Sequence, residues 1–304
     1  MEYILSTHNL TKIYGKQKAV DKVNLHIKKG DIYGLIGKNG AGKTTILRML
    51  GGLARPSEGE FSLYGYQGKE VKKLQSRLGL LIEEPGIYGN LSAYENLKIK
   101  SLAMGVKDKG TIQNILNLVG LDDVGKKAVK KFSLGMKQRL GIGLALVGNP
   151  DLVILDEPIN GLDPQGIAEI RETIESLNHE QGITFLISSH ILEELSKVAT
   201  NYGIIHKGVL LQEMTNEELV ENCGEYMEIR TEDVKNVCTI IESMNIKQYK
   251  VVDGKTVQIF ERMDESAEIN FALSSKGVRI KEMIVKNVSL EEYFLKLTGG
   301  EADV

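Results

Sequence analysis

The sequence predicts an α/β fold followed by a small α+β domain, and three observations lead to this prediction. Continuous apolar runs at 32–36, 152–155 and 183–187 are typical of a mainly parallel sheet covered on both faces. A glycine-rich turn joins the first of these runs to the apolar stretch TILRML, which is the order strand, turn, helix. After about residue 215, short strand and helix patterns alternate, which indicates a second domain.

Composition excludes several classes of protein. The 304 residues have room for one large domain and a smaller one. With 42% hydrophobic and 26% charged residues and a net charge of -3, the chain looks like a soluble globular protein without a nucleic-acid footprint. Its two cysteines, Cys223 and Cys238, form no CxxC pattern, so plain thiols in a reducing compartment are expected. No signal peptide or membrane span is apparent, which predicts a cytoplasmic chain.

The first domain is expected to cover residues 1–215. From Thr7 to about Gly52, the pattern predicts two strands flanking a turn, then the glycine loop and its helix. A helical stretch at about 93–147 is broken by turns at 105–110 and 125–131 and is expected to form an inserted helical subdomain.

The second domain is expected to cover residues 216–304. Its patterns predict strand, helix, strand, strand, helix, strand and a last helix, an order that fits a small split βαβ sandwich. No chemical motif recurs in it. The corresponding segments are 225–230, 232–244, 249–252, 256–260, 266–277, 278–285 and 289–297.

The glycine loop GKNGAGKTT, from Gly37 to Thr45, predicts a phosphate-binding site. Glycines let backbone N–H groups turn toward one anion, the following helix directs its partially positive end at the same point, and Lys43 adds a full charge. Thr44 is then placed to put its hydroxyl on a magnesium ion. The alternative is an ordinary glycine-rich turn between a strand and a helix.

Three polar residues follow two of the buried strands. Asp156 and Glu157 end the run LVILDEP, and ligands bind at the carboxyl ends of strands in open α/β sheets. Asp156 is predicted to hold magnesium, and Glu157 to orient or deprotonate the water that attacks a γ-phosphate. His190 ends ITFLISSH and can donate a hydrogen bond to that phosphate. The alternatives are a solvated turn or a helix cap for the acids and a surface or structural role for the histidine.

Five motifs occur together in one order, and their combination resembles the ATP-binding subunit of an ABC transporter over residues 1 to about 215. The tail resembles that of exporter ATPases with a small C-terminal domain. The resemblance implies the fold of a P-loop NTPase of ABC type, with ATP and Mg²⁺ as cofactors. It also implies a membrane permease and a second copy of the chain as partners, no nucleic acid, and a place on the inner face of the cell membrane. The motifs are the glycine loop, FSLGMKQRL at 132–140, LVILDEP at 152–158, NGLDP at 160–164 and ISSH at 187–190.

The resemblance also assigns roles to residues. Glu157 and His190 are implied to be catalytic. Ser133 and Gly135 of SLGM are implied to contact the γ-phosphate of ATP held by the opposite subunit, with Asp163 at the same interface. Tyr14 is implied to stack on adenine, with core packing as the alternative. The implied nucleotide contacts are Tyr14, Gly37, Lys38, Asn39, Gly40, Ala41, Gly42, Lys43, Thr44 and Thr45.

Three positions depart from the commonest family pattern. In SLGM, which resembles the family's signature segment, Leu134 and Met136 replace the usual Gly and Gln, and ATP hydrolysis is still expected. Glu83 stands where a glutamine usually touches magnesium, and a carboxylate binds this hard cation at least as well, so Glu83 is predicted to join Thr44 and Asp156 as a metal ligand. Together, Glu83 and the segment INGLDP at 159–164 resemble the pattern of one subgroup of exporter ATPases, which is tied to lantibiotic immunity and bacitracin resistance.

The segment 85–97 after Glu83 is expected either to receive a cytoplasmic helix of the permease or to pack the helical subdomain. The function expected from all these features is hydrolysis of MgATP by a nucleotide-sandwich homodimer, which powers export of a peptide antibiotic or drug by a separate permease. Two alternatives remain open from the sequence. One is a soluble ABC ATPase acting on a ribosome or repair complex, and the other is a regulatory module that senses ATP.

Overall fold

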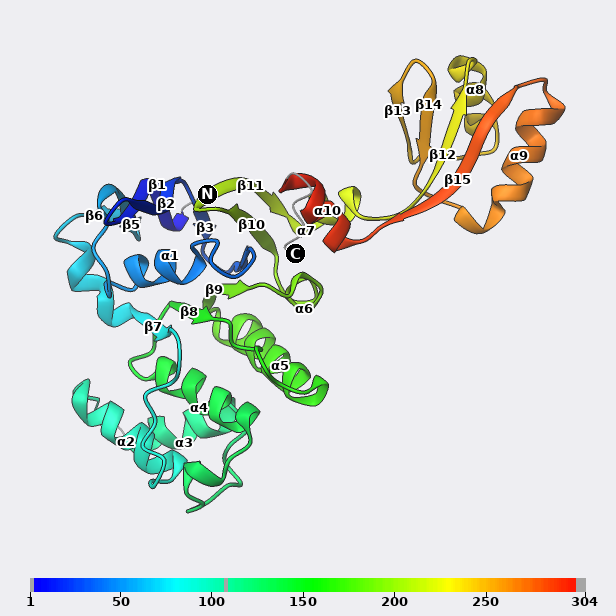
Figure 1. Ribbon diagram of the computed structural model, residues 1–304. Coiled ribbons are helices and arrows are strands. Elements are labelled where there is room, and N and C mark those ends of the chain that lie inside the picture. The colour runs from blue at the N-terminus through cyan, green and yellow to red at the C-terminus, as the bar shows by residue number, and fades with distance from the viewer. Residues whose placement is uncertain (1–2, 107–108, 299–304) are drawn as a thin grey trace. The chain divides into compact units, whose positions relative to one another are not determined.

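The structure is a computed structural model that describes residues 3–106 and 109–298. It contains two compact units, residues 1–216 and residues 217–304 (Figure 1). No helix within the described ranges has the length and apolar character needed to cross a bilayer.

A six-stranded sheet forms the centre of the N-terminal unit. Its order is β11-β10-β4-β9-β8-β7, and every pair is parallel except β10 with β11. All residues of β4, β8 and β9 are buried, which explains their continuous apolar runs and confirms a mainly parallel sheet. The bounds are β4 Ile32–Ile36, β7 Leu78–Leu81, β8 Leu152–Asp156, β9 Thr184–Ser189, β10 Asn201–His206 and β11 Val209–Thr215.

A second, antiparallel sheet covers helix α1, which follows the glycine loop. Its order is β2-β1-β5-β6, with β3 also paired to β1. Helix α1 contributes Ile46, Leu47, Met49 and Leu50 to one core that includes residues of both sheets, such as Leu10 and Leu35. The bounds are β1 Tyr3–Tyr14, β2 Gln17–Val23, β3 His26–Lys28, α1 Lys43–Leu50, β5 Glu58–Leu63 and β6 Tyr66–Gln67.

The prediction of two strands flanking a turn was incomplete in this part of the chain. Strands β1 and β2 flank the turn at Gly15, but β3 follows them before β4. The three residues of β3 are too few to show an alternating pattern. Its existence depends on pairing with β1, which the sequence pattern does not reveal.

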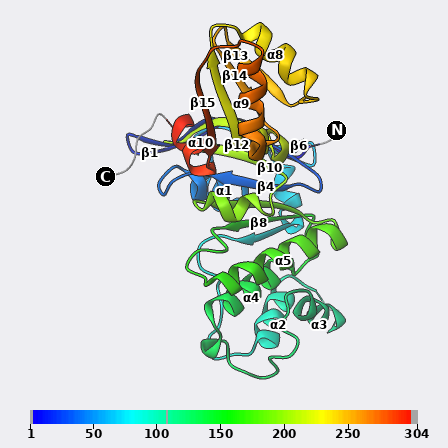
Figure 2. The ribbon, with the colours of Figure 1, turned by 90° about the vertical axis from the view of Figure 1, so that its right-hand side faces the viewer.

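Three helices form the stretch expected to be a helical subdomain: α2 Ala93–Ala103, α3 Lys109–Leu118 and α4 Leu134–Leu146, which pack on one another (Figure 2). Ser92 and Glu95 form a capping box that starts α2. Gly110 lies inside α3, and residues 107–108 of the expected turn at 105–110 lie outside the described residues. The remaining elements of the unit are α5 Pro164–Gln181, α6 Leu192–Ser196 and 3₁₀ turns at Val71–Arg77 and Val129–Lys131.

The C-terminal unit has the expected order of elements from β12 onward, but the short helix α7, which precedes β12, was not predicted. Its four-stranded sheet has the order β13-β14-β12-β15 with every pair antiparallel, and this is the split βαβ arrangement. Ile240 and Ile241 of α8 and Ile269 and Leu273 of α9 share a core with Ile229 of β12. The bounds are α7 Asn216–Asn222, β12 Gly224–Thr231, α8 Val234–Ser243, β13 Tyr249–Asp253, β14 Thr256–Ile259, a 3₁₀ turn Met263–Glu265, α9 Ser266–Ser275, β15 Ile280–Val288 and α10 Leu290–Leu297.

Leu186 on β9 is fully buried in the core of the N-terminal unit. We therefore expect Leu186→Ala to lower the free energy of unfolding of this unit by about 2–5 kcal/mol. Urea denaturation followed by circular dichroism measures this difference. The matched control is Leu53→Ala, at a position with 64% of the residue exposed, which we expect to have little effect. Equal losses for the two variants would contradict the assignment of the core.

Candidate nucleotide-binding site

The glycine loop runs from the end of β4 to the start of α1, and its backbone permits only glycine at several positions. Gly40 has φ of 79° and Gly42 has φ of 108°, both in the left-handed region. A Cβ atom on Gly37 would lie 2.5 Å from the carbonyl oxygen of Ile205, and one on Gly42 would lie 2.6 Å from that of Ala19. The predicted contacts in the loop and in the first turn of α1 are Gly37, Lys38, Asn39, Gly40, Ala41, Gly42, Lys43, Thr44 and Thr45.

Lys43 begins α1, and only 5% of this residue is exposed. Its Nζ donates hydrogen bonds to the carbonyl oxygens of Gly37 at 2.6 Å and Lys38 at 3.2 Å. It also lies 3.1 Å from Oε1 of Glu157. The ammonium group is therefore surrounded by oxygen acceptors, as a buried charge requires.

Asp156 ends β8 and Glu157 directly follows it, and Ser188 on the neighbouring strand β9 forms hydrogen bonds with both. Asp156 is paired in register with Ser188, whose hydroxyl donates to Asp156 Oδ1 at 2.6 Å. The same hydroxyl accepts a hydrogen bond from the backbone N–H of Glu157 at 3.0 Å. Glu157 has φ of 49°, a conformation rare outside glycine. Asp156 is buried, so the solvated turn that was the alternative does not describe this residue.

The Glu157 carboxylate joins three elements. Oε1 faces Lys43 on α1, and Oε2 lies 2.7 Å from Nδ1 of His190, which follows β9. The side chain of Glu157 is 20% exposed and that of His190 is 31% exposed, so solvent reaches the group from one side. We refer to Lys43, Glu157 and His190 as the carboxylate cluster.

Two contacts in this region escaped the sequence analysis. Ser188 is fully buried near the end of β9. A serine that directly follows the apolar residues of a buried strand was the available sign in the sequence, because a buried hydroxyl needs a hydrogen-bond partner. Arg48 on α1 forms an ion pair with Glu83, which follows β7 and has φ of 65°. Their spacing in the sequence gives no sign of this pair.

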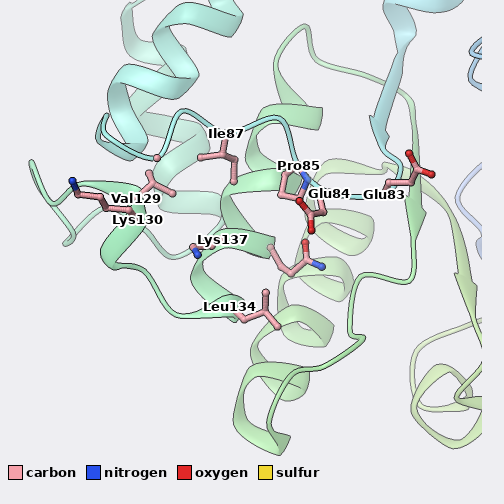
Figure 3. A pocket seen from close by; sticks show the side chains of 10 residues that line it. Glu83, Glu84, Pro85, Ile87, Val129, Lys130, Leu134 and Lys137 are labelled. Carbon is pink, nitrogen blue, oxygen red and sulfur yellow. The ribbon is translucent and has the colours of Figure 1, made fainter.

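The structure therefore places Glu83 beside Arg48, with its side chain 59% exposed. Figure 3 shows its carboxylate pointing away from Leu134 and Lys137, which lie at the other side of a hollow of about 380 Å³. We call this hollow the Glu84 groove. Its lining residues are Glu83, Glu84, Pro85, Ile87, Gly89, Val129, Lys130, Leu134, Lys137 and Gln138.

Tyr14 ends β1 and is 49% exposed, so core packing, the alternative for this residue, is wrong. The Nζ of Lys12 lies 5.0 Å from the centre of the Tyr14 ring. An exposed aromatic ring next to a cation is suited to stacking on a flat, anion-bearing ligand.

Ser133, Gly135 and Asp163 form a second group at the starts of α4 and α5 (Figure 1). The Ser133 hydroxyl caps α4 by accepting the N–H of Met136 at 3.2 Å. Asp163 caps α5 by accepting the N–H of Gly166 at 2.9 Å. A Cβ atom on Gly135 would lie 3.7 Å from Cα of Gly166, so the two helix starts lie close together.

Comparisons with known proteins identify the family to which this geometry belongs. The profile of the family described as ABC transporter matches residues 20–160. The chain is 43% identical to the bacitracin transport ATP-binding protein BcrA of Bacillus licheniformis over 302 residues, 99% of each protein. The chain belongs to the ABC transporter family. This ABC protein is also 48% identical, over 211 residues, to the lantibiotic transport ATP-binding protein SrtF of Streptococcus pyogenes, covering 69% of the chain and 90% of SrtF.

The fold of this ABC protein agrees with a solved structure. It superimposes with a TM-score of 0.66 on cbiO1 of Clostridium perfringens, part of the ABC transporter complex cbiONQ, over 81% of this chain and 97% of that one at 24% identity. The expected fold class, a P-loop NTPase of ABC type, is confirmed, and so is the expected resemblance to ATP-binding subunits. The chain is therefore an ABC ATPase that binds nucleotide.

Ser188→Ala tests the hydrogen bonds that hold Asp156 and the Glu157 N–H. The variant removes the donor to Asp156 Oδ1, whereas the Glu157 N–H still has the carbonyl oxygen of Ser188 at 3.2 Å. Loss of a donor to a buried carboxylate costs about 1–3 kcal/mol, so we expect a lower unfolding midpoint and slower ATP hydrolysis. Thermal unfolding and a phosphate-release assay measure these effects. Ser196→Ala is the matched control, because that hydroxyl donates to the carbonyl oxygen of Glu193 within its own helix α6, away from the carboxylate cluster. Unchanged hydrolysis in Ser188→Ala would contradict the positioning role.

Proposed function

We propose that this ABC ATPase hydrolyses MgATP between two copies of the chain and that the Glu157 carboxylate handles the attacking water. The observation that carries the proposal is the carboxylate cluster. Glu157 is positioned by a buried cation on one oxygen and by the His190 ring on the other, at the mouth of the glycine loop. A carboxylate held in this way can accept a proton from, or orient, a water molecule at the γ-phosphate.

The Lys43–Glu157 pair gives Glu157 two states. A triphosphate carries more negative charge than one carboxylate, so it outcompetes Glu157 for Lys43 when it enters the loop. Oε1 of Glu157 then turns from Lys43 to the water, while the contact between Oε2 and the His190 ring is kept. The water becomes reactive only when nucleotide is bound, because only then does Glu157 leave Lys43.

Thr44, Asp156 and Glu83 are the residues that we propose to hold Mg²⁺, which would neutralise charge on the phosphate oxygens. All three supply oxygen donors, which suit this hard cation. Asp156 is buried and oriented by Ser188, whereas Glu83 is paired to Arg48 and must release it to reach a metal. Arg48 and the cation therefore compete for Glu83.

We propose that Ser133 and Gly135 complete the site of the second copy, with Asp163 at the same interface. The start of the thirteen-residue helix α4 would direct the positive end of its dipole toward the phosphate. ATP would then hold two copies together, and loss of phosphate would let them separate. Tyr14 would stack on adenine with its exposed ring.

A separate permease would supply the membrane path, and the Glu84 groove is the surface that we propose receives it. The groove has apolar walls from Pro85, Ile87 and Leu134 beside charged groups, which suits an amphipathic helix (Figure 3). The relatives BcrA and SrtF are described as bacitracin and lantibiotic transport proteins. Their descriptions favour a peptide antibiotic or drug as cargo, exported from the inner face of the membrane, over action on a ribosome.

Glu157→Gln tests the proposed catalytic role. We expect normal ATP binding, hydrolysis slower by roughly 10² to 10⁴ fold, and accumulation of a closed dimer, because the amide cannot accept the proton. Phosphate release, nucleotide binding and sedimentation with ATP measure these outcomes. The matched control is Glu180→Gln, an exposed acid near the end of α5, which we expect to be unaffected. Normal turnover in Glu157→Gln would show that another group handles the water.

Arg48→Ala and Glu83→Gln test competition for Glu83. Because an exposed ion pair contributes at most about 1 kcal/mol, we expect Arg48→Ala to lower the Mg²⁺ concentration for half-maximal hydrolysis by up to about fivefold. We expect Glu83→Gln to raise it, since an amide carries no charge. A magnesium titration of ATPase activity measures both. Equal values for the native protein and both variants would remove Glu83 from the metal site.

A further inference from the structure

Strand β15 leaves one of its edges unpaired. It stands at the end of the sheet order of the C-terminal unit, and among the described residues its strand partner is β12 (Figure 1). It is nine residues long and contains no proline, and Ile284 and Val285 are 43% and 42% exposed. A long edge strand with exposed apolar residues is a template for pairing with another strand.

The sequence of β15 is complementary to itself when it is reversed about Ile284. In an antiparallel pair of two copies, Ile284 faces Ile284 of the other copy, and Met283 faces Val285. Glu282 faces Lys286, and Lys281 faces Asn287. Every position thus meets a residue of matching character, and the charged pair occurs twice. Directly opposed apolar and opposite-charge pairs stabilise antiparallel strands.

Other registers lose this match. A shift of one residue in one direction sets Lys281 opposite Lys286 of the other copy, and a shift in the other direction sets Met283 opposite Lys286. A shift of two residues places Ile284 opposite either Glu282 or Lys286. Like charges or a charge facing an apolar residue destabilise a strand pair, so the centred register is the one favoured.

The charges that the pairing needs are already held on one face of the sheet. Glu282 forms an ion pair with Arg230 at 3.3 Å, and Lys286 forms one with Glu228 at 3.0 Å. Pairing of two copies would extend these into rows of alternating charge: Arg230 and Glu282 of one copy, then Lys286 and Glu228 of the other. The opposite face of the sheet carries the core of the unit.

We propose that two copies of this chain associate through β15, in antiparallel register about Ile284, to form one continuous sheet from their C-terminal units. The contact needs no nucleotide and gives the C-terminal unit a role as a dimerisation module. A nine-residue strand pair is a small interface, so the association is weak by itself and gains from any second link between the same two chains. The nucleotide sandwich would supply such a link.

Cysteine cross-linking tests the register in the full-length chain. Cys223→Ser and Cys238→Ala remove the native thiols, and Lys43→Ala prevents nucleotide from joining the copies. Single cysteines are then introduced and treated with a short bifunctional thiol reagent without ATP. Ile284→Cys is expected to cross-link with itself. Glu282→Cys and Lys286→Cys are expected to cross-link when mixed and to give little product alone.

Phe271→Cys is the control, because it is 77% exposed and lies on α9 rather than on β15. Equal cross-linking of Phe271→Cys and Ile284→Cys, or no product from the mixture, would overturn the proposal. Failure of this test would not contradict the proposed nucleotide site, because Lys43→Ala prevents nucleotide from joining the two copies in this experiment.

Sedimentation provides a second measurement that needs no thiol. Ile284→Lys puts two like charges at the centre of the pair, so we expect self-association without nucleotide to weaken by at least about tenfold. Phe271→Lys adds the same charge on α9 and is expected to associate like the native chain. Circular dichroism verifies that both variants fold. Equal association of the three proteins would contradict pairing through β15.

Discussion

The pair between Lys43 and Glu157 is the interaction on which the account of this ATPase depends. It joins the end of the glycine loop to the residue that follows β8, and the Glu157 carboxylate also contacts His190, which follows β9. The parallel sheet makes this possible because the carboxyl ends of β4, β8 and β9 lie at one edge. Burial of these strands therefore brings a cation, a carboxylate and a histidine together beside the glycine loop, where we propose that phosphate binds.

In the proposed mechanism, this arrangement links nucleotide binding to reactivity. In the structure, the charge of Lys43 is neutralised by Glu157, so the cation is satisfied while it is buried. A phosphate that bound Lys43 would release the Glu157 carboxylate, so binding of the nucleotide would free the group that is proposed to handle the water. Ser188 keeps the backbone of Glu157 and the carboxylate of Asp156 fixed throughout, so the change is confined to one side chain.

Much of the fold and the family could be predicted from the sequence, because phosphate chemistry fixes residue types at short spacings. The glycines of the loop are set by backbone conformation, and the runs of β8 and β9 are set by burial on both faces. Features that depend on long-range pairing could not be predicted. Strand β3, the hydroxyl of Ser188 and the Arg48–Glu83 pair each depend on a partner distant in the sequence, and no periodic pattern marks them.

The roles assigned to the loop residues, to Glu157 and to Glu83 remain proposals, and one measurement addresses their common basis. It is a crystal structure of the protein with Mg²⁺ and a non-hydrolysable ATP analogue. We expect Nζ of Lys43 to contact the phosphates, the Glu157 carboxylate to have moved away from Lys43, and His190 still to contact that carboxylate. A nucleotide bound in the loop with the Lys43–Glu157 pair intact would contradict the account.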